Sequence, residues 1–237
     1  MRLLPHLLFL LLSFSAVANE NFDKGKDEYR KDNYPEAITL FKIAAEEGSA
    51  RAQSYLGYMY NKGKGVAQDH KQALEWYRQA AEQGNARDQY NLAMMYEKGK
   101  GDTQDYTQAI EWHTKSAEQG NPRAQYHLAL IYYNGKGVTQ DYKQAFKWYI
   151  MAAEDGNAGV QYSIGVMYEN GQGVDQDDKQ AVEWYTKAAE QGDAKAQYHL
   201  GLMYASGKGV TQDQNQATAW SQKAAEQGYT SDKHNAL

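Results

Sequence analysis

The sequence predicts an all-α protein, an α/α superhelical solenoid in which similar helix pairs stack side by side. Three observations predict it. Glycine, tryptophan and tyrosine recur every 36 residues, helix-capping residues recur twice in each interval, and the apolar residues between them follow helical spacing. One pair cannot bury its own apolar faces, whereas stacked pairs can. The recurring positions are Gly48, Gly84, Gly120, Gly156, Gly192 and Gly228; Trp76, Trp112, Trp148, Trp184 and Trp220; and Tyr60, Tyr96, Tyr132, Tyr168 and Tyr204.

The first helix of each interval, helix A, is expected to begin after a short polar N-cap residue. In the first interval this residue is Ser49, whose side-chain oxygen can accept from the free N–H groups of the first turn. Leu56, Met59 and Tyr60 then form an apolar stripe at helical spacing. Gly63 stops the helix, because glycine adopts the left-handed conformation at little cost. The equivalent N-caps are Asn85, Asn121, Asn157 and Asp193.

The second helix, helix B, is expected to begin after an aspartate. Asp69 is followed three residues later by Gln72, which is a capping-box variant in which each side chain would bond a backbone donor of the other. The stripe on this helix comprises Ala73, Trp76, Tyr77, Ala80 and Ala81, and Gly84 ends it. The recurring tryptophans, tyrosines and methionines are therefore interpreted as core. The equivalent helix B caps are Asp105, Asp141, Asp177 and Asp213, each with glutamine three residues on.

The two ends of the chain differ from the repeats. Residues 1–18 combine Arg2, a short apolar run and Ala16-Val17-Ala18, which predicts a cleaved secretory signal peptide. We therefore expect a periplasmic or secreted protein with no transmembrane segment in the mature chain. The expected organisation is an N-terminal capping helix pair at 21–48 within a solenoid at 19–228, repeats at 49–84, 85–120, 121–156, 157–192 and 193–228, and a polar tail at 229–237.

Composition excludes several classes of function. The 237 residues hold 25 Lys and Arg against 30 Asp and Glu, and removal of Arg2 with the signal peptide leaves 24 against 30, a net charge of −6. This balance argues against nucleic-acid binding, which needs a strongly basic face. The absence of cysteine excludes disulfides, thiol nucleophiles and a lipid-anchored cysteine.

The repeat resembles the Sel1-like repeat family, a relative of the tetratricopeptide repeat. The resemblance is carried by Ala-Gln-Tyr-x-Leu-Gly-x-Met-Tyr with Gly-x-Gly at 196–209, and by Gln-Ala-x-x-Trp-Tyr-x-x-Ala-Ala-Glu-Gln-Gly at 72–84. Departures are few, among them Asp102 where other repeats have valine, Gly159 early in a helix A, and Ser221 after Trp220. The resemblance implies an α/α superhelix that acts as an adaptor or scaffold for other proteins. It also implies an alternative, because some exported cysteine-rich members bind penicillin or hydrolyse β-lactams.

Sequence motifs give little support to catalysis, phosphate binding or metal binding. No serine after residue 18 has lysine three residues later, as a serine β-lactamase needs, and there is no Gly-x-Ser-x-Gly or His-Glu-x-x-His. The Lys-Gly-Lys-Gly loops lack Walker A spacing, and no two histidines form an i, i+4 pair. We therefore expect no catalytic residues, no metal site and no cofactor.

Comparison between repeats predicts where a partner would bind. Positions 51, 55, 58 and 62 and their equivalents vary between repeats and fall on one side of helix A, away from the apolar stripe. This face carries six basic residues and no acidic residue. We expect it to line a concave groove that binds a protein or peptide segment with acidic and apolar residues. The predicted groove residues are Arg51, Tyr55, Tyr58, Lys62, Arg87, Asn91, Met94, Lys98, Arg123, His127, Leu130, Lys195, His199 and Leu202.

The leading hypothesis is therefore an exported, non-enzymatic protein-interaction scaffold. The alternative is a β-lactam- or peptidoglycan-directed hydrolase or binding protein. A third hypothesis is a structural spacer that captures no partner.

Overall fold

The computed structural model describes the backbone of residues 4–230 and the side chains of residues 17–230. Residues 1–3, the side chains of residues 4–16 and residues 231–237 lie outside this description. Most of the predicted signal peptide at 1–18 and most of the predicted tail at 229–237 therefore lie outside the described residues.

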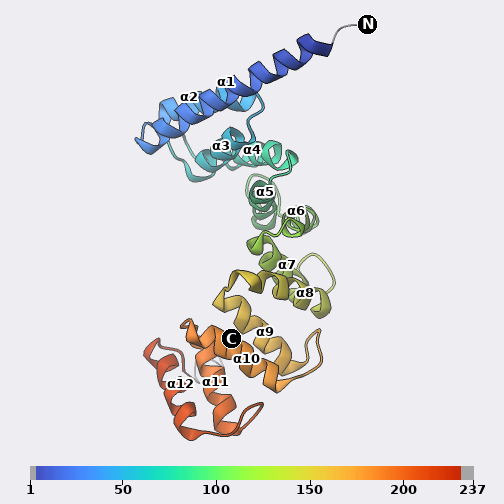
Figure 1. Cartoon of the computed structure of the whole chain (residues 1–237), viewed down its shortest axis with the longest axis vertical. Helices are drawn as coiled ribbons and strands as arrows, with labels where there is room; N and C mark the ends of the chain where they lie inside the picture. The colour runs from blue at the N-terminus through green and yellow to red at the C-terminus, as the bar shows by residue number, and fades with distance from the viewer. Residues whose placement is uncertain (1–3, 231–237) are drawn as a thin grey trace. The chain divides into compact units, whose positions relative to one another are not determined.

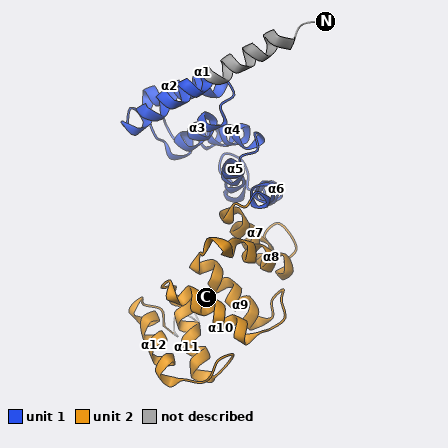
Figure 2. Cartoon of the chain, in the orientation of Figure 1, with its two compact units in different colours: residues 1–119 blue, residues 120–237 orange. Residues whose placement is uncertain are grey.

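The described chain is all α-helical, with twelve α-helices and no strand among residues 4–230, which confirms the predicted fold class. The helices form two compact units, residues 1–119 and 120–237, which are coloured separately in Figure 2. Unit 1 holds α1 (Leu4–Arg30), α2 (Tyr34–Glu46), α3 (Ala50–Lys62), α4 (His70–Glu82), α5 (Ala86–Lys98) and α6 (Tyr106–Glu118). Unit 2 holds α7 (Pro122–Asn134), α8 (Tyr142–Ala152), the 3₁₀ turn η1 (Ala153–Asp155), α9 (Ala158–Asn170), α10 (Asp178–Glu190), α11 (Ala194–Ser206) and α12 (Gln214–Glu226).

The helices pack as successive pairs, so that α3 lies beside α4 and α9 beside α10 (Figure 1). Within each unit, the second helix of one pair also packs against the first helix of the next, as α4 does against α5 and α10 against α11. None of the described helices combines the length and the apolar character that a membrane span requires.

The predicted caps form in every repeat. The Ser49 hydroxyl accepts from the backbone N–H of Ala52, and the Asp69 carboxylate accepts from those of Lys71 and Gln72. Gly63 ends α3 with a φ of 68°, in the left-handed region. The capping box departs from the expected reciprocal form, because the Gln72 side-chain amide donates to the Asp69 carboxylate and not to a backbone group.

The core of each unit is built from the predicted stripes. In unit 1, Phe41, Leu56 and Met59 have no exposed surface, and in unit 2 the same is true of Ile164 and Tyr185. The prediction that all five tryptophans belong to the core is wrong for four of them.

Only Trp148 is buried, with 7% of its surface exposed, whereas the other four are half-buried at the margin of the core. At three of these four, a lysine three residues later covers the ring, with Nζ 4.0–4.2 Å from its centroid; the pairs are Trp112–Lys115, Trp184–Lys187 and Trp220–Lys223.

Candidate functional site on the first helix of each repeat

The predicted groove residues lie on the first helices of the repeats, α3 and α5 in unit 1 and α7, α9 and α11 in unit 2. Their exposure follows their position along the helix. Residue 51 and its equivalents are exposed in every repeat, and so are residue 62 and its equivalents, whereas residue 55 and its equivalents are half-buried. At position 58 and its equivalents, Tyr58 and Leu202 are exposed by 38% and 43%, and Met94 and Leu130 are half-buried. Each unit therefore presents cationic and polar ends flanking an apolar centre.

In unit 1, the N-terminal pair holds two of these side chains in place. The Tyr55 ring packs against Phe22 and Phe41, with ring centroids 5.7 and 4.9 Å away. The Arg51 guanidinium lies over the Phe22 ring at 4.1 Å from its centroid. An arginine that stacks on an aromatic ring keeps its charge and retains N–H donors at its edge. Arg51 is therefore a pre-oriented cation at the start of the α3 face.

The cations of this face carry no ion pair within the described part of unit 1. Arg51, Lys62, Arg87 and Lys98 are all exposed, and no carboxylate lies within ion-pair distance of any of them in the structure described here. Elsewhere in the unit, cations are paired on the helix surface, as Arg78 is with Glu75 at 2.7 Å. An exposed charge that lacks an internal partner is available to a partner molecule.

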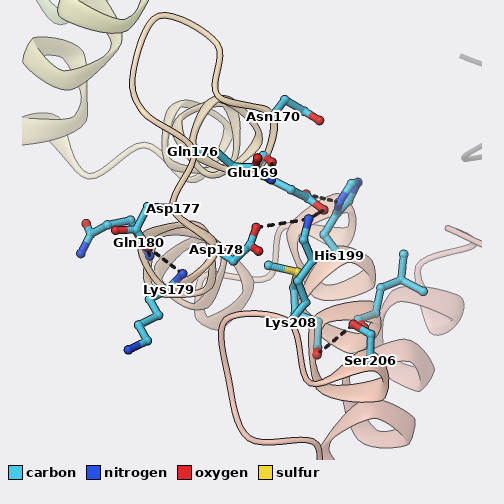
Figure 3. A network of polar contacts seen from close by, with 12 residues as sticks. Glu169, Asn170, Gln176, Asp177, Asp178, Lys179, Gln180, His199, Ser206 and Lys208 are labelled. Carbon is cyan, nitrogen blue, oxygen red and sulfur yellow. Dashed lines mark hydrogen bonds and ion pairs between the residues drawn. The ribbon is translucent and has the colours of Figure 1, made fainter.

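In unit 2, one residue of this face, His199, belongs to a network of charged side chains centred on Glu169 of α9 (Figure 3). One carboxylate oxygen, Oε2, lies 3.4 Å from Nδ1 of His199 on α11. The other, Oε1, lies 3.4 Å from Nζ of Lys208, in the loop after α11. Lys208 also reaches Oδ1 of Asp178, the first residue of α10, at 3.2 Å. The network therefore joins the two repeats 157–192 and 193–228.

Two tyrosines complete the network. The Tyr185 hydroxyl on α10 donates to Glu169 Oε2 at 2.6 Å, and Nε2 of His199 lies 3.2 Å from the hydroxyl of Tyr162 on α9. The hydrogen bond from His199, followed by those from Tyr185 and the charge of Lys208, lowers the pKa of Glu169 to about 2 despite its partial burial. Burial, followed by the charge of Glu169, raises the pKa of Tyr185. Glu169 is therefore a carboxylate and Tyr185 a neutral donor at physiological pH.

The structure thus separates the predicted residues into two groups. His199 is only 13% exposed in its side chain and is engaged with Glu169 and Tyr162, so that it contributes to the packing of two repeats. By contrast, the cations of unit 1 and the side chains of Tyr58, Leu202 and Lys195 face outward.

Comparison of repeats alone did not identify Glu169, Lys208 and Asp178. Glu169 takes a position occupied elsewhere by Asn61, Glu97, Tyr133 or Ala205, and only the fold brings it near a loop lysine. A signal was nevertheless present in that loop. Lys64, one of the equivalents of Lys208, also reaches back to the first residue of the preceding helix B, where its Nζ lies 3.0 Å from the Tyr34 hydroxyl.

Comparison with known proteins gives a consistent assignment. The family model described as Sel1 repeat matches six segments, residues 16–49, 50–85, 86–121, 122–157, 158–193 and 194–229. The first of these segments overlaps residues 21–48, the predicted capping helix pair. A comparison with curated proteins found no similar sequence.

Two solved structures are similar along most of the chain. One is c5321, a protective antigen of uropathogenic Escherichia coli with an SLR fold, at 39% identity and a TM-score of 0.82 over 89% of this chain and 46% of that one. The present chain therefore spans less than half the length of that protein. The other is a Sel1 repeat protein from Oxalobacter formigenes, at 35% identity and a TM-score of 0.81, covering 88% of this chain and 86% of that one.

Proposed function

Because the chain belongs to the Sel1 repeat family, whose members generally serve as protein-interaction scaffolds, we propose that it is an exported, non-enzymatic scaffold that binds a polypeptide segment. The segment lies along the exposed faces of the first helices. One observation carries this proposal: Arg51, Lys62, Arg87 and Lys98 form a set of unpaired cations beside Tyr58 in a chain whose net charge is −5. A partner with acidic and apolar side chains complements such a face in both charge and hydrophobicity.

The predicted residues should differ in how much they contribute to binding. An exposed aromatic beside unpaired cations is typical of the anchors that dominate binding energy. Tyr58 and the cations of unit 1 should therefore contribute most to binding in that unit. In unit 2, Leu202 and Lys195 should contribute more than His199, whose ring is engaged within the protein.

The test is crosslinking in the native host with photo-reactive residues at positions 94 and 130, followed by mass spectrometry. The double variant Arg87→Glu, Arg123→Glu should lower the crosslinked yield of the identified partner at least about tenfold, because it reverses charges that steer and hold an acidic segment. The matched control is Lys71→Glu, Lys143→Glu, which changes net charge equally at exposed positions on the second helices.

The melting temperature of both double variants should stay within a few degrees of the wild type, because all four side chains are exposed. Equal yields from the two double variants would exclude a role for the first-helix cations. Export is tested separately by N-terminal sequencing of the mature protein, which should begin after Ala18.

A further inference from the structure

A buried glutamine connects neighbouring helices in most of the repeats. It lies in the first turn of helix A, and its amide donates to a carbonyl at the end of the preceding helix B. A second glutamine lies just after helix B of the same repeat, and its side-chain amide donates to the side-chain carbonyl of the first glutamine. The first set of bonds is Gln53 to Ala45 at 3.3 Å, Gln89 to Ala81 at 3.5 Å and Gln197 to Ala189 at 3.1 Å; the second is Gln83 to Gln53, Gln119 to Gln89, Gln191 to Gln161 and Gln227 to Gln197, all at 2.7–2.9 Å.

The repeat 121–156 departs from this pattern at its end. Its helix B, α8, stops at Ala152 after 11 residues, whereas the second helices of the other four repeats have 13, and the chain continues as the 3₁₀ turn Ala153–Asp155. Asp155 stands where those repeats have the second glutamine. Its carboxylate is exposed and forms no hydrogen bond with any described residue. The end of α8 therefore lacks a polar link that the equivalent helices have.

The junction that follows, between α8 and α9, is also less tightly packed. The Gln161 amide forms no bond with the Ala153 carbonyl in the described structure, although its equivalents on α3, α5 and α11 do so. Ala153 is half-buried, whereas the equivalent residues Ala45, Ala81 and Ala189 are at most 4% exposed.

The first turn of α9 adds a further source of flexibility, because Gly159 lies there where every other repeat has arginine or lysine. Glycine in a helix costs about 1 kcal/mol relative to alanine, so this turn opens more easily. The missing Gln161–Ala153 bond and Gly159 thus weaken the α8–α9 junction directly. In addition, the end of α8 lacks the glutamine link that ties the other second helices to the first helix of their own repeat.

We propose that the α8–α9 junction is a hinge built into unit 2, at which the repeats 157–192 and 193–228 move together relative to the repeat 121–156. On the C-terminal side of the hinge, the Glu169 network joins α9, α10 and α11 through His199 and Lys208, so those helices move as one body. The hinge lies between Leu130 on α7 and Leu202 on α11, and motion there changes the spacing of these two apolar side chains. It is independent of whether those residues bind a partner.

Hydrogen exchange at two equivalent helix starts tests the proposal. The N–H groups of Val160 and Ala196 are capped alike, by Asn157 at 3.1 Å and by Asp193 at 2.8 Å, so that any difference reports on the opening of the junction. In the full chain, amides 160–164 should exchange at least about tenfold faster than amides 196–200 after correction for intrinsic rates. Equal protection of the two segments would overturn the hinge.

Two substitutions should remove the hinge, and one should create a second hinge. Asp155→Gln supplies the missing amide, and Gly159→Ala stiffens the first turn, with only the Asn157 side chain, at 3.3 Å, near the added Cβ. Together they should slow exchange at 160–164 about tenfold and leave 196–200 unchanged. Conversely, Gln191→Asp should accelerate exchange at 196–200. If the double variant leaves exchange at 160–164 unchanged and Gln191→Asp leaves exchange at 196–200 unchanged, the glutamine links do not control this motion.

Distance measurements give a readout that does not depend on exchange chemistry. Because the chain has no cysteine, spin labels can be placed at chosen sites without removing native thiols. Exposed positions 147 and 183 span the proposed hinge, and positions 183 and 219 span the α10–α11 junction at the same 36-residue separation. The distance distribution of the first pair should be at least twofold broader than that of the second pair, and it should narrow in the Asp155→Gln, Gly159→Ala variant. Equal widths for the two pairs would contradict the proposal.

Discussion

Two carboxylates, Glu169 and Asp88, have pKa values shifted in opposite directions, because one has partners that compensate for its burial and the other does not. Glu169 accepts from His199 and Tyr185 and lies beside Lys208, which together lower its pKa to about 2. Asp88 is only 5% exposed, and burial raises its pKa, an effect that the Ser54 hydroxyl and Arg87 oppose but do not cancel. The local environment of each carboxylate therefore determines how acid changes its contribution to stability.

For Glu169, a lowered folded-state pKa stabilises the protein above the unfolded value of 4.5, and this contribution disappears as the pH falls towards 2. The shift corresponds to about 3 kcal/mol. The variant Glu169→Gln should therefore lower the urea midpoint of unit 2 at pH 7 and should lose less stability than the wild type between pH 4.5 and 2. Denaturation curves across this range test it, and curves that remain parallel would show that the pairing contributes nothing.

Asp88 occupies a position that is alanine or valine in the other repeats, Ala52, Ala124, Val160 and Ala196, all of them buried. The residue that donates to it, Ser54, stands where the others have tyrosine. The two departures therefore coincide at one contact between α3 and α5. A carboxylate with a raised folded-state pKa destabilises the protein at neutral pH, and this penalty is relieved as the pH falls through that pKa towards 3.8.

Replacing Asp88 with alanine should stabilise unit 1 by about 1–2 kcal/mol at pH 7, because it removes a buried charge whose single hydroxyl donor compensates incompletely. The gain should shrink as the pH approaches 3.8. The matched control, Ala196→Asp, places a carboxylate in the equivalent position of unit 2 and should destabilise it. Thermal melting at pH 7 and pH 4 measures both, and destabilisation by Asp88→Ala would contradict this account.

At the scale of the element, the Gly-x-Gly loops determine how closely successive repeats approach. Within each unit, the second glycine of a loop lies against the start of the preceding helix B, as Gly65, Gly101, Gly173 and Gly209 do. A Cβ on Gly173 would lie 2.1 Å from the Tyr142 carbonyl oxygen, and one on Gly209 would lie 2.1 Å from that of Asp178. Both glycines also have positive φ, at 75° and 69°. Glycine is required there for space as well as for conformation.

The two glycines of one loop should therefore respond differently to alanine. Gly173→Ala must displace the backbone of α8 and should cost at least about 3 kcal/mol in addition to the conformational penalty. Gly171→Ala, with φ of 64° and its nearest neighbour, the Gln176 Cβ, 3.4 Å from the new Cβ, should cost only the left-handed penalty of about 1–2 kcal/mol. Urea denaturation of the two variants measures the difference. Equal costs would show that the loop does not restrict the approach of the repeats.

The sequence predicted the elements well because the signals that define them are local. Ser49 and Asp69 cap their helices through bonds within three residues, and Gly63 ends α3 through its own φ. The burial of the tryptophans was predicted less well, because recurrence every 36 residues indicates a shared environment but not how deeply the side chain is buried. Trp184 lies at the margin of the core, where Lys187 covers its ring. A lysine three residues after a tryptophan was the signal for this arrangement.

At the scale of the molecule, regular repetition predicts the stacking of helix pairs but conceals sites that arise from exceptions. The exposed positions of the first helices follow from helix geometry and could be listed from the sequence. The Glu169 network could not, because its members come from α9, α10, α11 and a loop that only the fold brings together, and one of them, Asp178, stands where the other repeats have histidine, tyrosine or glutamine. The hinge likewise depends on Asp155 and Gly159, which are exceptions within an otherwise regular array.

Because a repeat protein is stabilised mainly by contacts between neighbours, its response to acid should differ along the chain. Acidification relieves the penalty at Asp88 in unit 1 and removes the stabilisation at Glu169 in unit 2. Pepsin digestion of the full chain between pH 4.5 and 2 should therefore cut within α9–α11 before α3–α5, and the ratio of the two cleavage rates should rise as the pH falls. Taking the ratio removes the pH dependence of pepsin itself. In Glu169→Gln the ratio should vary less with pH than in the wild type, because only the titration of Asp88 remains. Earlier cleavage within α3–α5, or a ratio that varies equally in variant and wild type, would show that these carboxylates do not control the acid response.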